Sequence, residues 1–320
     1  MNRSLFKKIF AALLTVCIIA SSCVVVFAAD IKKTDKAAVK KERFVVIGDS
    51  IATGYLLEDL DYSYASLMAK ALDLEEVNLA VNGYDSKDVL NLLRTGKAKK
   101  AIMDASLISL SVGGNNILKY VIKQIEAMDD VAVEDMAELF SPDLMKQFTA
   151  GAESFKTEFP EIIAKIKKLN PDAVIVVQTV YNPFMFIKTG MKLEPATICD
   201  IVISRINKVI KAYLTENPDA FILSDVHAAF KAKAEPSYLN ADFETFNFDP
   251  HPALDGHALI AETNLAALAG EPVETADAAK TDKDDKAVIL PTTDEMLESI
   301  SKKAAEKFKE IVNADKNKKP

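Results

Sequence analysis

A serine on a tight turn after an apolar run, Ser50, is a residue that could do covalent chemistry. Ser50 follows the apolar run Phe44–Ile47 within Gly48-Asp49-Ser50, so a helix starting there would present its hydroxyl and backbone N–H groups at one edge of a sheet. A serine hydroxyl attacks a carbonyl carbon at neutral pH only when a base accepts its proton. A Gly-Asp-Ser tripeptide alone is more typical of an ordinary turn, so the hypothesis requires a histidine elsewhere.

The sequence contains three histidines, and one of them has the expected surroundings. His251 lies in Asn247–Pro252, a proline-stiffened loop before a helix, with Asp249 two residues away to orient its imidazole. Asp255, or a backbone carbonyl, is the alternative orienting group. His257 lies in a helical pattern and His227 follows the last expected strand, and both are candidates for structural roles.

Two further loops contain groups that could stabilise a tetrahedral oxyanion. Gly83 in "VNGYDS" would let a backbone amide approach a substrate, and Asn115 in "GGNN" would bring a side-chain amide to a strand end. Taken singly, each loop is a turn signal.

Five apolar runs explain how these loops could meet. The expected strands are residues 44–47, 77–80, 107–112, 173–180 and 220–223. Helical patterns lie between them, among them one over residues 64–72 and one over residues 198–213 that ends at Asn217-Pro218. Alternating strands and helices predict a parallel sheet covered on both faces, with its chemistry at the carboxyl ends of the strands.

The order of these residues resembles the SGNH (GDSL-type) hydrolases, a family of esterases, lipases and acylhydrolases. "IGDSIATGY" resembles the nucleophile block, "VNGYDS" the glycine block, "GGNN" the asparagine block and "DPHP" the histidine block, and the resemblance covers residues 43–270. It implies a flavodoxin-like three-layer α/β/α sandwich with a five-stranded parallel sheet. It also implies that Ser50 is the nucleophile and His251 the base and acid, that Ser50, Gly83 and Asn115 form the oxyanion hole, and that no metal or cofactor is needed.

Two positions depart from the family pattern. The third block commonly reads Gly-x-Asn-Asp, whereas Asn116 occupies its last place, and the last block commonly reads Asp-x-x-His, whereas Phe248 stands three residues before His251. Asp249 at the shorter spacing is therefore the expected third member of the triad, although Pro250 restricts the backbone between the pair.

The apolar segment after the fourth strand is the expected substrate pocket. Phe184, Met185 and Phe186 could line an acyl-chain site or a lid, or could pack in the core. This favours an acyl or lipid-like ester as substrate, with O-acetyl groups of carbohydrate or cell-wall polymers as the alternative. A binding or scaffold protein without turnover is the rival from another class, whereas a dinucleotide site is excluded because no Gly-x-Gly-x-x-Gly follows the first strand.

The first 28 residues predict export. Positive charges precede the apolar run 9–29, and Val26-Phe27-Ala28 has signal-peptidase spacing, so we expect a cleaved signal peptide and a secreted or cell-surface protein. Lipidation at Cys23 and retention as a membrane anchor are the alternatives. Cleavage removes three positive charges and no acids, which moves the net charge from −8 to −11 and argues against nucleic acid as a partner. It leaves Cys199 as the remaining cysteine, expected in the core.

The rest of the chain flanks one main domain. A charged tether at 29–42 precedes the hydrolase domain at 43–270, and a charged linker at 271–291 leads to an amphipathic helix at 292–313 and a tail at 314–320. Thr292 and Glu295 have capping-box spacing, and an apolar stripe includes Leu297, Ile300, Ala304, Phe308 and Ile311. This stripe could dock on the domain, pair with a partner or touch a membrane. The sequence does not indicate an oligomeric state.

Overall fold

The structure is a computed structural model, and it describes residues 41–117, 119–120, 141–185, 194–233, 236–242, 247–271 and 293–316. The signal segment, Cys23, Phe186, most of the tether and most of the linker lie outside these ranges. In chain order the elements are β1 (Arg43–Gly48), α2 (Ser50–Thr53), η1 (Leu60–Tyr62), α3 (Tyr64–Leu72), β2 (Glu75–Asn78), α4 (Ser86–Leu92), α5 (Gly96–Met103), β3 (Ala105–Ser111), α7 (Pro142–Leu169), β4 (Val174–Gln178), α8 (Pro195–Glu216), β5 (Ile222–Ser224), α9 (Val226–Lys233), η3 (Pro236–Tyr238), β6 (Leu239–Asp242), β7 (Asn247–Pro252), α10 (Leu254–Ala269) and α11 (Thr293–Lys316).

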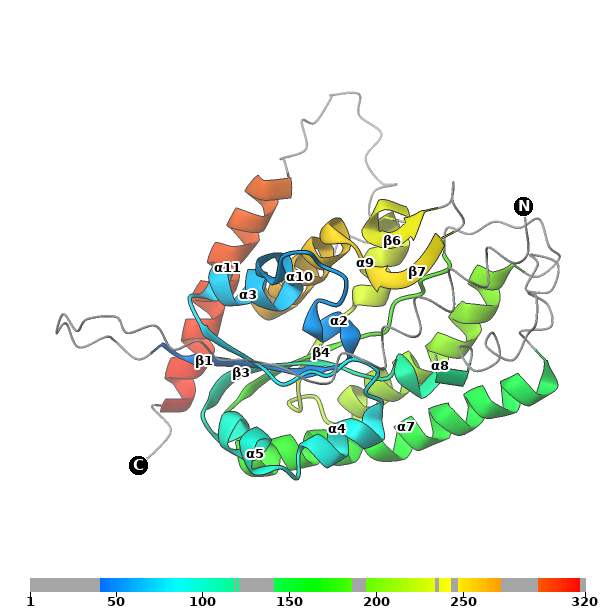
Figure 1. The fold of residues 1–320 in the computed structure, drawn as a ribbon. Helices are drawn as coiled ribbons and strands as arrows, with labels where there is room; N and C mark the ends of the chain where they lie inside the picture. Colours follow the sequence, from blue (N-terminus) through cyan, green and yellow to red (C-terminus); the bar gives the residue numbers. More distant parts are fainter. Residues whose placement is uncertain are drawn as a thin grey trace, which may run out of the picture.

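A five-stranded parallel sheet forms the middle layer of the molecule. Its strand order is β2-β1-β3-β4-β5, and every neighbouring pair is parallel. Helices α4, α5 and α7 lie below the sheet in Figure 1, and α3, α9 and α10 lie above it. Helix α8 packs in the same apolar cluster as α7, and α11 packs in the same cluster as α3 and α10. The predicted three-layer α/β/α architecture is therefore confirmed, and the carboxyl ends of all five strands meet at one edge.

The second strand differs most from its prediction. It covers Glu75–Asn78 instead of residues 77–80, and it is partly exposed, whereas a buried strand was expected. It lies at the edge of the sheet, where its polar side chains can face solvent. The charged side chains of Glu75 and Glu76 disfavour pairing of this open edge with another chain. The apolar residues Leu79 and Ala80 follow the strand and lead into the glycine loop.

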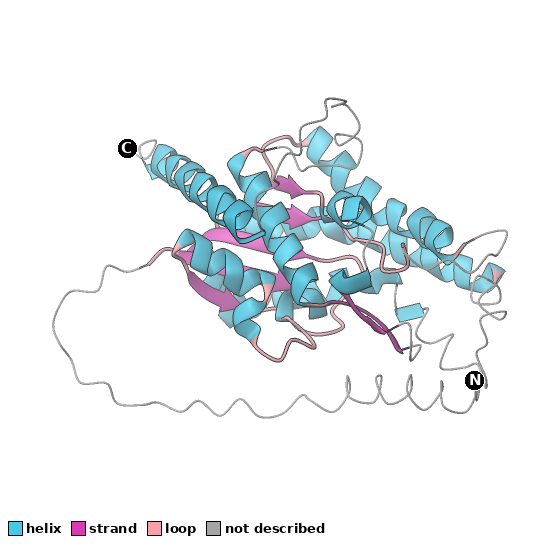
Figure 2. Cartoon of the chain, turned by 90° about the horizontal axis from the view of Figure 1, so that it is seen from above, coloured by secondary structure: helices cyan, strands magenta, loops and turns pink. Residues whose placement is uncertain are grey.

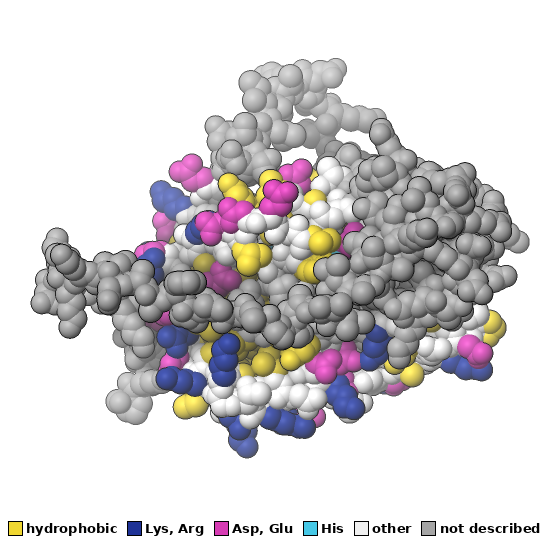
Figure 3. Space-filling model, in the orientation of Figure 1, with side chains coloured by type: hydrophobic (Ala, Val, Ile, Leu, Met, Phe, Trp, Pro, Cys, Tyr) yellow, Lys and Arg dark blue, Asp and Glu magenta, His cyan; other side chains and the backbone are white. Residues whose placement is uncertain are grey.

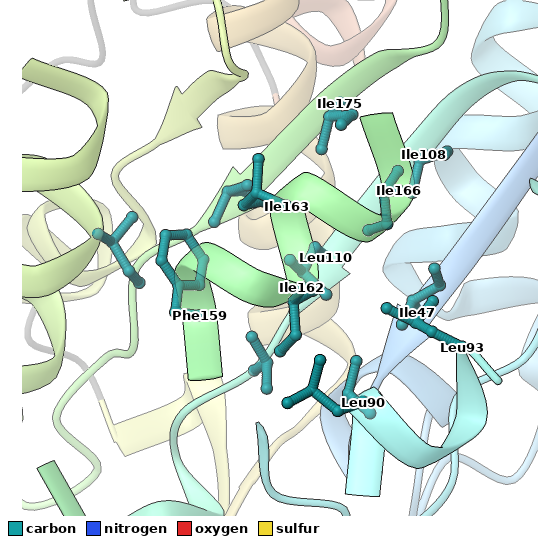
Figure 4. Packing of buried hydrophobic residues seen from close by; sticks show 14 of the residues in the cluster. Ile47, Leu90, Leu93, Ile108, Leu110, Phe159, Ile162, Ile163, Ile166 and Ile175 are labelled. Carbon is teal, nitrogen blue, oxygen red and sulfur yellow. The ribbon is translucent and has the colours of Figure 1, made fainter. Parts of the chain in front are cut away.

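The lower helices close a large apolar core against the sheet. Helix α7 places Phe159, Ile162, Ile163 and Ile166 against strand residues such as Ile108, all fully buried, as Figure 4 shows. The three- and four-residue spacing of these side chains puts them on one face of the helix. This packing fixes α7 relative to the ends of β1 and β3.

The upper helices form a second core that includes the C-terminal helix. Ala304 and Phe308 of α11 are buried, and Ile300 and Ile311 pack against the same cluster as Met68 of α3. Seen from above, α11 lies over this helical layer (Figure 2). Burial of a phenylalanine side chain contributes about 1.5–3 kcal/mol. Of the three fates that the sequence left open for this stripe, the structure adopts docking on the domain.

A short antiparallel ribbon, β6 with β7, stands above the sheet at its active edge. The sequence predicted a loop at Asn247–Pro252, and this prediction was wrong: these residues form β7, whose pairing with β6 includes a register shift between Leu239 and Ala241. Two prolines in six residues hide the strand pattern, because proline is unusual inside a sheet and is tolerated where pairing is irregular.

On the face of the molecule seen in Figure 3, hydrophobic side chains are scattered among charged ones, and Lys and Arg side chains gather along the lower layer. Within the part of the chain that the structure describes, no helix has the length and hydropathy needed to cross a membrane.

Candidate active site

The nucleophile turn follows β1 and is built by close backbone packing. A Cβ atom at Gly48 would lie 2.4 Å from the carbonyl oxygen of Ser111 at the end of β3, so the turn requires glycine. Asp49 caps α2 by accepting the backbone N–H of Ile51 at 3.1 Å. Ser50 is the first residue of α2, and backbone N–H groups of a helix's first turn have no partner within the helix. Because Asp49 uses the N–H of Ile51, the N–H of Ser50 is the candidate oxyanion donor of this turn.

Three side chains form a continuous line of hydrogen bonds at this edge. The Nε2 atom of His251 lies 2.8 Å from Ser50 Oγ, and its Nδ1 atom lies 2.6 Å from Asp249 Oδ1. The side chains of His251 and Asp249 are 15% and 10% exposed, so water competes little for these bonds. The structure thus brings together the serine, the histidine and the acid that the sequence proposed as a triad.

The strand geometry of β7 explains why the shorter Asp-x-His spacing succeeds. Side chains two residues apart in an extended strand point to the same side, so Asp249 and His251 face one another across Pro250. Asp249 Oδ1 also accepts the backbone N–H of His251 at 2.8 Å. Asp255, the alternative acid, is exposed in the first turn of α10. The two-residue spacing therefore allows Asp249 to complete the triad.

Neighbouring side chains hold the histidine segment in place. The hydroxyl of Tyr181, which follows β4, donates to the carbonyl oxygen of Pro250 at 2.6 Å, and Asn240 of β6 donates to that of Pro252 at 3.0 Å. The ring of Tyr55 meets the imidazole of His251 edge-on, with 4.8 Å between ring centroids. Sequence reasoning missed these supports, because each comes from a segment distant from His251 in the chain or from a residue type with no local signal.

The other two histidines make hydrogen bonds outside the triad. His257 is fully buried, and its Nδ1 atom accepts the backbone N–H of Tyr64 at 3.3 Å. Burial lowers the pKa of His257 to about 4, so its ring is neutral at ordinary pH. The Nε2 atom of His227 lies 3.2 Å from a carboxylate oxygen of Asp200. Cys199 was expected in the core, but the residue is only partly buried and belongs to neither core cluster. Burial of its thiol raises the pKa of Cys199 well above its usual range, as expected of an unreactive cysteine.

The two predicted oxyanion loops are tied to one another and to the nucleophile turn. Gly83 adopts the left-handed region, with φ of +79°, which favours glycine there. Asn82 beside it accepts the hydroxyl of Thr53 in α2 at 2.6 Å. The Nδ2 atom of Asn115 donates one hydrogen to the carbonyl oxygen of Tyr84 at 3.1 Å, which fixes the direction of its second hydrogen.

The predicted pocket residues belong to the segment that follows β4. Phe184 and Met185 are half-buried, and Met185 packs against the second core, whereas Phe186 lies outside the described residues. The apolar side chains Leu56, Val81 and Leu254 are 42%, 39% and 52% exposed. Leu56 is next to Tyr55, Leu254 lies three residues beyond His251, and Val81 N–H donates to the carbonyl oxygen of Gly48. These three exposed side chains were not singled out by the sequence.

A second carboxyl group, Asp49, is buried directly beside the serine. Burial raises its pKa to about 6, and the hydrogen bond from Ile51 and the nearby His251 oppose that rise. Within the described ranges, no group of three or more His, Cys, Asp or Glu side chains is arranged to hold a metal ion.

Comparison with known proteins supports the same class. The described sheet and helices are those of the SGNH hydrolase fold. A lipase, Lip_vut3, from a goat rumen metagenome matches with a TM-score of 0.51 and 21% identity over 71% of this chain and 97% of that one. Phospholipase A1 from Streptomyces albidoflavus NA297 matches with a TM-score of 0.54 and 18% identity over 72% of this chain and 100% of that one.

The sequence itself identifies the family. The profile of the GDSL-like Lipase/Acylhydrolase family matches residues 46–259. The uncharacterized protein YpmR of Bacillus subtilis (strain 168) is 25% identical over 225 residues, which are 70% of this chain and 77% of that protein. The chain belongs to the GDSL-like lipase/acylhydrolase family, and this membership implies ester hydrolase activity.

The buried Asp49 carboxyl generates a prediction about stability and pH. Between the ordinary pKa of 3.8 and about 6, the folded protein retains a proton that the unfolded chain has released. Rising pH therefore destabilises the fold through this group, and the effect is complete above pH 6. Asp49→Asn keeps an acceptor for Ile51 but cannot ionise, so we expect the variant to gain about 2–3 kcal/mol relative to wild type between pH 4 and pH 7.

Urea unfolding of both proteins at several pH values measures this difference. His257 acts in the opposite direction, because its lowered pKa removes stability as pH falls from 6.5 towards 4. His257 is present in both proteins, so the difference between them isolates Asp49. A difference that does not change with pH would contradict the prediction.

Proposed function

We propose that this protein is a secreted or cell-surface serine hydrolase that cleaves carboxylic esters through an acyl-enzyme on Ser50. The observation that carries the proposal is the line of hydrogen bonds from Ser50 through His251 to Asp249, buried at the carboxyl edge of the sheet. Family membership supports the reaction class, and the geometry supports the assignment of residues.

In the first half-reaction, Ser50 Oγ attacks the ester carbonyl and its proton passes to His251 Nε2. The negative charge that develops on the carbonyl oxygen is stabilised by N–H donors from Ser50, Gly83 and Asn115. When the tetrahedral intermediate collapses, His251 gives its proton to the departing alcohol. In the second half-reaction, His251 activates water, which releases the acid and restores the serine hydroxyl.

Asp249 sets the protonation state that this sequence of steps needs. A carboxylate oxygen 2.6 Å from Nδ1 requires the proton of the neutral imidazole to be on Nδ1, so Nε2 is left as the acceptor for the serine proton. The negative charge of Asp249 then stabilises the imidazolium that forms.

We propose an acyl ester with a chain longer than acetyl as the substrate. Four side chains with apolar surface lie near the triad. Tyr55 contacts His251, and Leu56 follows it in the chain. The backbone N–H of Val81 donates to the carbonyl oxygen of Gly48 in the nucleophile turn, and Leu254 lies three residues after His251. Exposed leucine and valine side chains at a site gain more from a long acyl chain than from a methyl group, by about 0.8 kcal/mol per buried methylene. O-acetyl groups on carbohydrate or cell-wall polymers are the competing substrate.

Export is part of the proposal and is supported by the charge and hydropathy of residues 1–28. The N-terminal residue of the protein recovered from its host, read by mass spectrometry, separates cleavage after Ala28 from lipidation at Cys23. An intact N-terminus on a soluble protein would contradict export.

A series of p-nitrophenyl esters tests the reaction. The purified protein should hydrolyse these esters, and Ser50→Ala should lower kcat by at least about 10³-fold because the nucleophile is lost. A fluorophosphonate should label wild type and not Ser50→Ala, with phosphonylation of Oγ and release of fluoride.

The chain length of the acyl group separates the two substrate classes in the same series. We expect kcat/KM to rise from acetate to longer chains, and a maximum at acetate would favour the O-acetyl esterase. Equal rates for wild type and Ser50→Ala would refute the hydrolase, and would leave the rival of a binding or scaffold protein.

Asp249→Asn tests the third member of the triad against a matched neighbour. The asparagine oxygen can still accept the two hydrogen bonds, but the charge that stabilises the imidazolium is lost, so kcat should fall by about 10²–10⁴-fold with residual activity remaining. The matched control is Asp255→Asn, because Asp255 is an exposed acid four residues from His251. A larger loss for Asp255→Asn than for Asp249→Asn would reverse the assignment.

A further inference from the structure

A buried amide, Asn116, stands next to the oxyanion asparagine where the resembling family commonly has an acid. Asn116 is 1% exposed. Its Oδ1 atom accepts the backbone N–H of Ser86 at 3.1 Å, and its Nδ2 atom donates to Ser86 Oγ at 2.7 Å. Ser86 is the first residue of α4, is itself fully buried, and donates its hydroxyl hydrogen to the carboxylate of Glu158 in α7.

The direction of every hydrogen in this chain of bonds is fixed. A backbone N–H can only donate, so the side of Asn116 that faces the Ser86 backbone must be its oxygen, and the other side must be the NH₂ group. The Ser86 hydroxyl receives that hydrogen and has one hydrogen of its own, which goes to Glu158. Asn116 thus donates to Ser86, and Ser86 donates to Glu158. We call this directed chain of hydrogen bonds the relay; in it, each donor has one hydrogen for each acceptor.

The relay lies against the glycine loop and holds it from below. Ser86 is three residues after Gly83, and Tyr84 between them accepts the hydrogen bond from Asn115. The packing of α7 here is close, because a Cβ atom on Gly151 would lie 2.0 Å from the carbonyl oxygen of Asn116. The loop that carries Gly83 is therefore fixed to a helix that takes no direct part in the triad.

We infer that Asn116, Ser86 and Glu158 are positioning residues for the oxyanion hole, and that the amide at position 116 is matched to the acid at position 158. The inference rests on the proposed function, because it concerns the donors of that same site. It also accounts for the departure of Asn116 from the family pattern.

The matching has a definite chemical consequence. An aspartate at position 116 could still accept the backbone N–H of Ser86, but it would place a second carboxylate on a hydroxyl that has one hydrogen to give. Two acceptors would then compete for this hydrogen at a buried site, where an unpaired charge is costly. Either one carboxyl takes up a proton or the relay opens and Gly83 moves.

The test is a double-mutant cycle with Asn116→Asp, Glu158→Gln and the two combined. At pH 8 we expect Asn116→Asp to lower kcat by about 10- to 100-fold with little change in KM, because displaced oxyanion donors act on the transition state. The ratio of variant to wild-type kcat should rise as pH falls, since a proton on either carboxyl replaces the missing hydrogen. Glu158→Gln alone should stay within about threefold of wild type, since its amide oxygen still accepts from Ser86.

The double variant should recover at least about tenfold of the lost kcat. The amide introduced at position 158 can rotate to donate to the Ser86 hydroxyl, which then donates its own hydrogen to the carboxylate introduced at position 116. The control pairs Asn116→Asp with Glu153→Gln, which removes an exposed charge from the same helix and should rescue nothing. An Asn116→Asp protein as active as wild type at every pH, or equal rescue by Glu153→Gln, would overturn the inference.

Unfolding free energies of the same four proteins separate this inference from the proposed function. If wild type hydrolyses no ester, the proposed function fails, yet the relay still predicts that Glu158→Gln restores the stability lost in Asn116→Asp. Additive effects of the two substitutions on both kcat and unfolding free energy would refute the relay. If one of these variants unfolds on purification, Asn116 and Asn116→Asp are compared in the Ser86→Ala background instead. This background lacks the shared hydroxyl, so the difference between an amide and an acid at position 116 should disappear.

Discussion

The hydrogen bond between Ser50 and His251 joins two segments that are 201 residues apart in the chain, and the remaining features of the site depend on its length of 2.8 Å. Its serine end is fixed by the approach of Gly48 to Ser111, where β1 and β3 leave no room for a side chain. Its histidine end is fixed by β7, which does not belong to the main sheet. The fold therefore has to position a separate ribbon over the sheet, and Tyr181 does this by linking the loop after β4 to Pro250.

The features of this arrangement that depend on local residue patterns and on residue order could be predicted from the sequence. The apolar run at 44–47 and the helical face of α3 follow from local periodicity, and the order of Ser50, Gly83, Asn115 and His251 places them at one edge of a parallel sheet. What could not be predicted depends on distant partners. β7 pairs with β6 in spite of its two prolines, and Asn240 and Tyr181, which bind its carbonyl groups, carry no signal of that role. The orientation of Asp249 follows from this pairing.

Two carboxyl groups flank the same histidine and have different environments. Asp249 accepts two hydrogen bonds from His251, one from its backbone and one from its ring, so its charge is matched to an imidazolium. Asp49 lies beneath the serine turn and is held mainly by the backbone of α2, so burial opposes its ionisation. Burial disfavours the charge of Asp49, whereas the two hydrogen bonds from His251 make Asp249 the carboxyl that serves the base.

The C-terminal helix contributes to this site through the layer that it covers. By burying Ala304 and Phe308 against the second core, α11 braces the layer of α3 and α10. These two helices are joined by the hydrogen bond from Tyr64 to His257, and α10 begins two residues after β7 ends. A displacement of α10 would be transmitted directly to Pro252 and from there to His251. Helix α11 folds back onto this domain because its apolar stripe is buried against the second core, and it thereby stabilises the layer that positions the base.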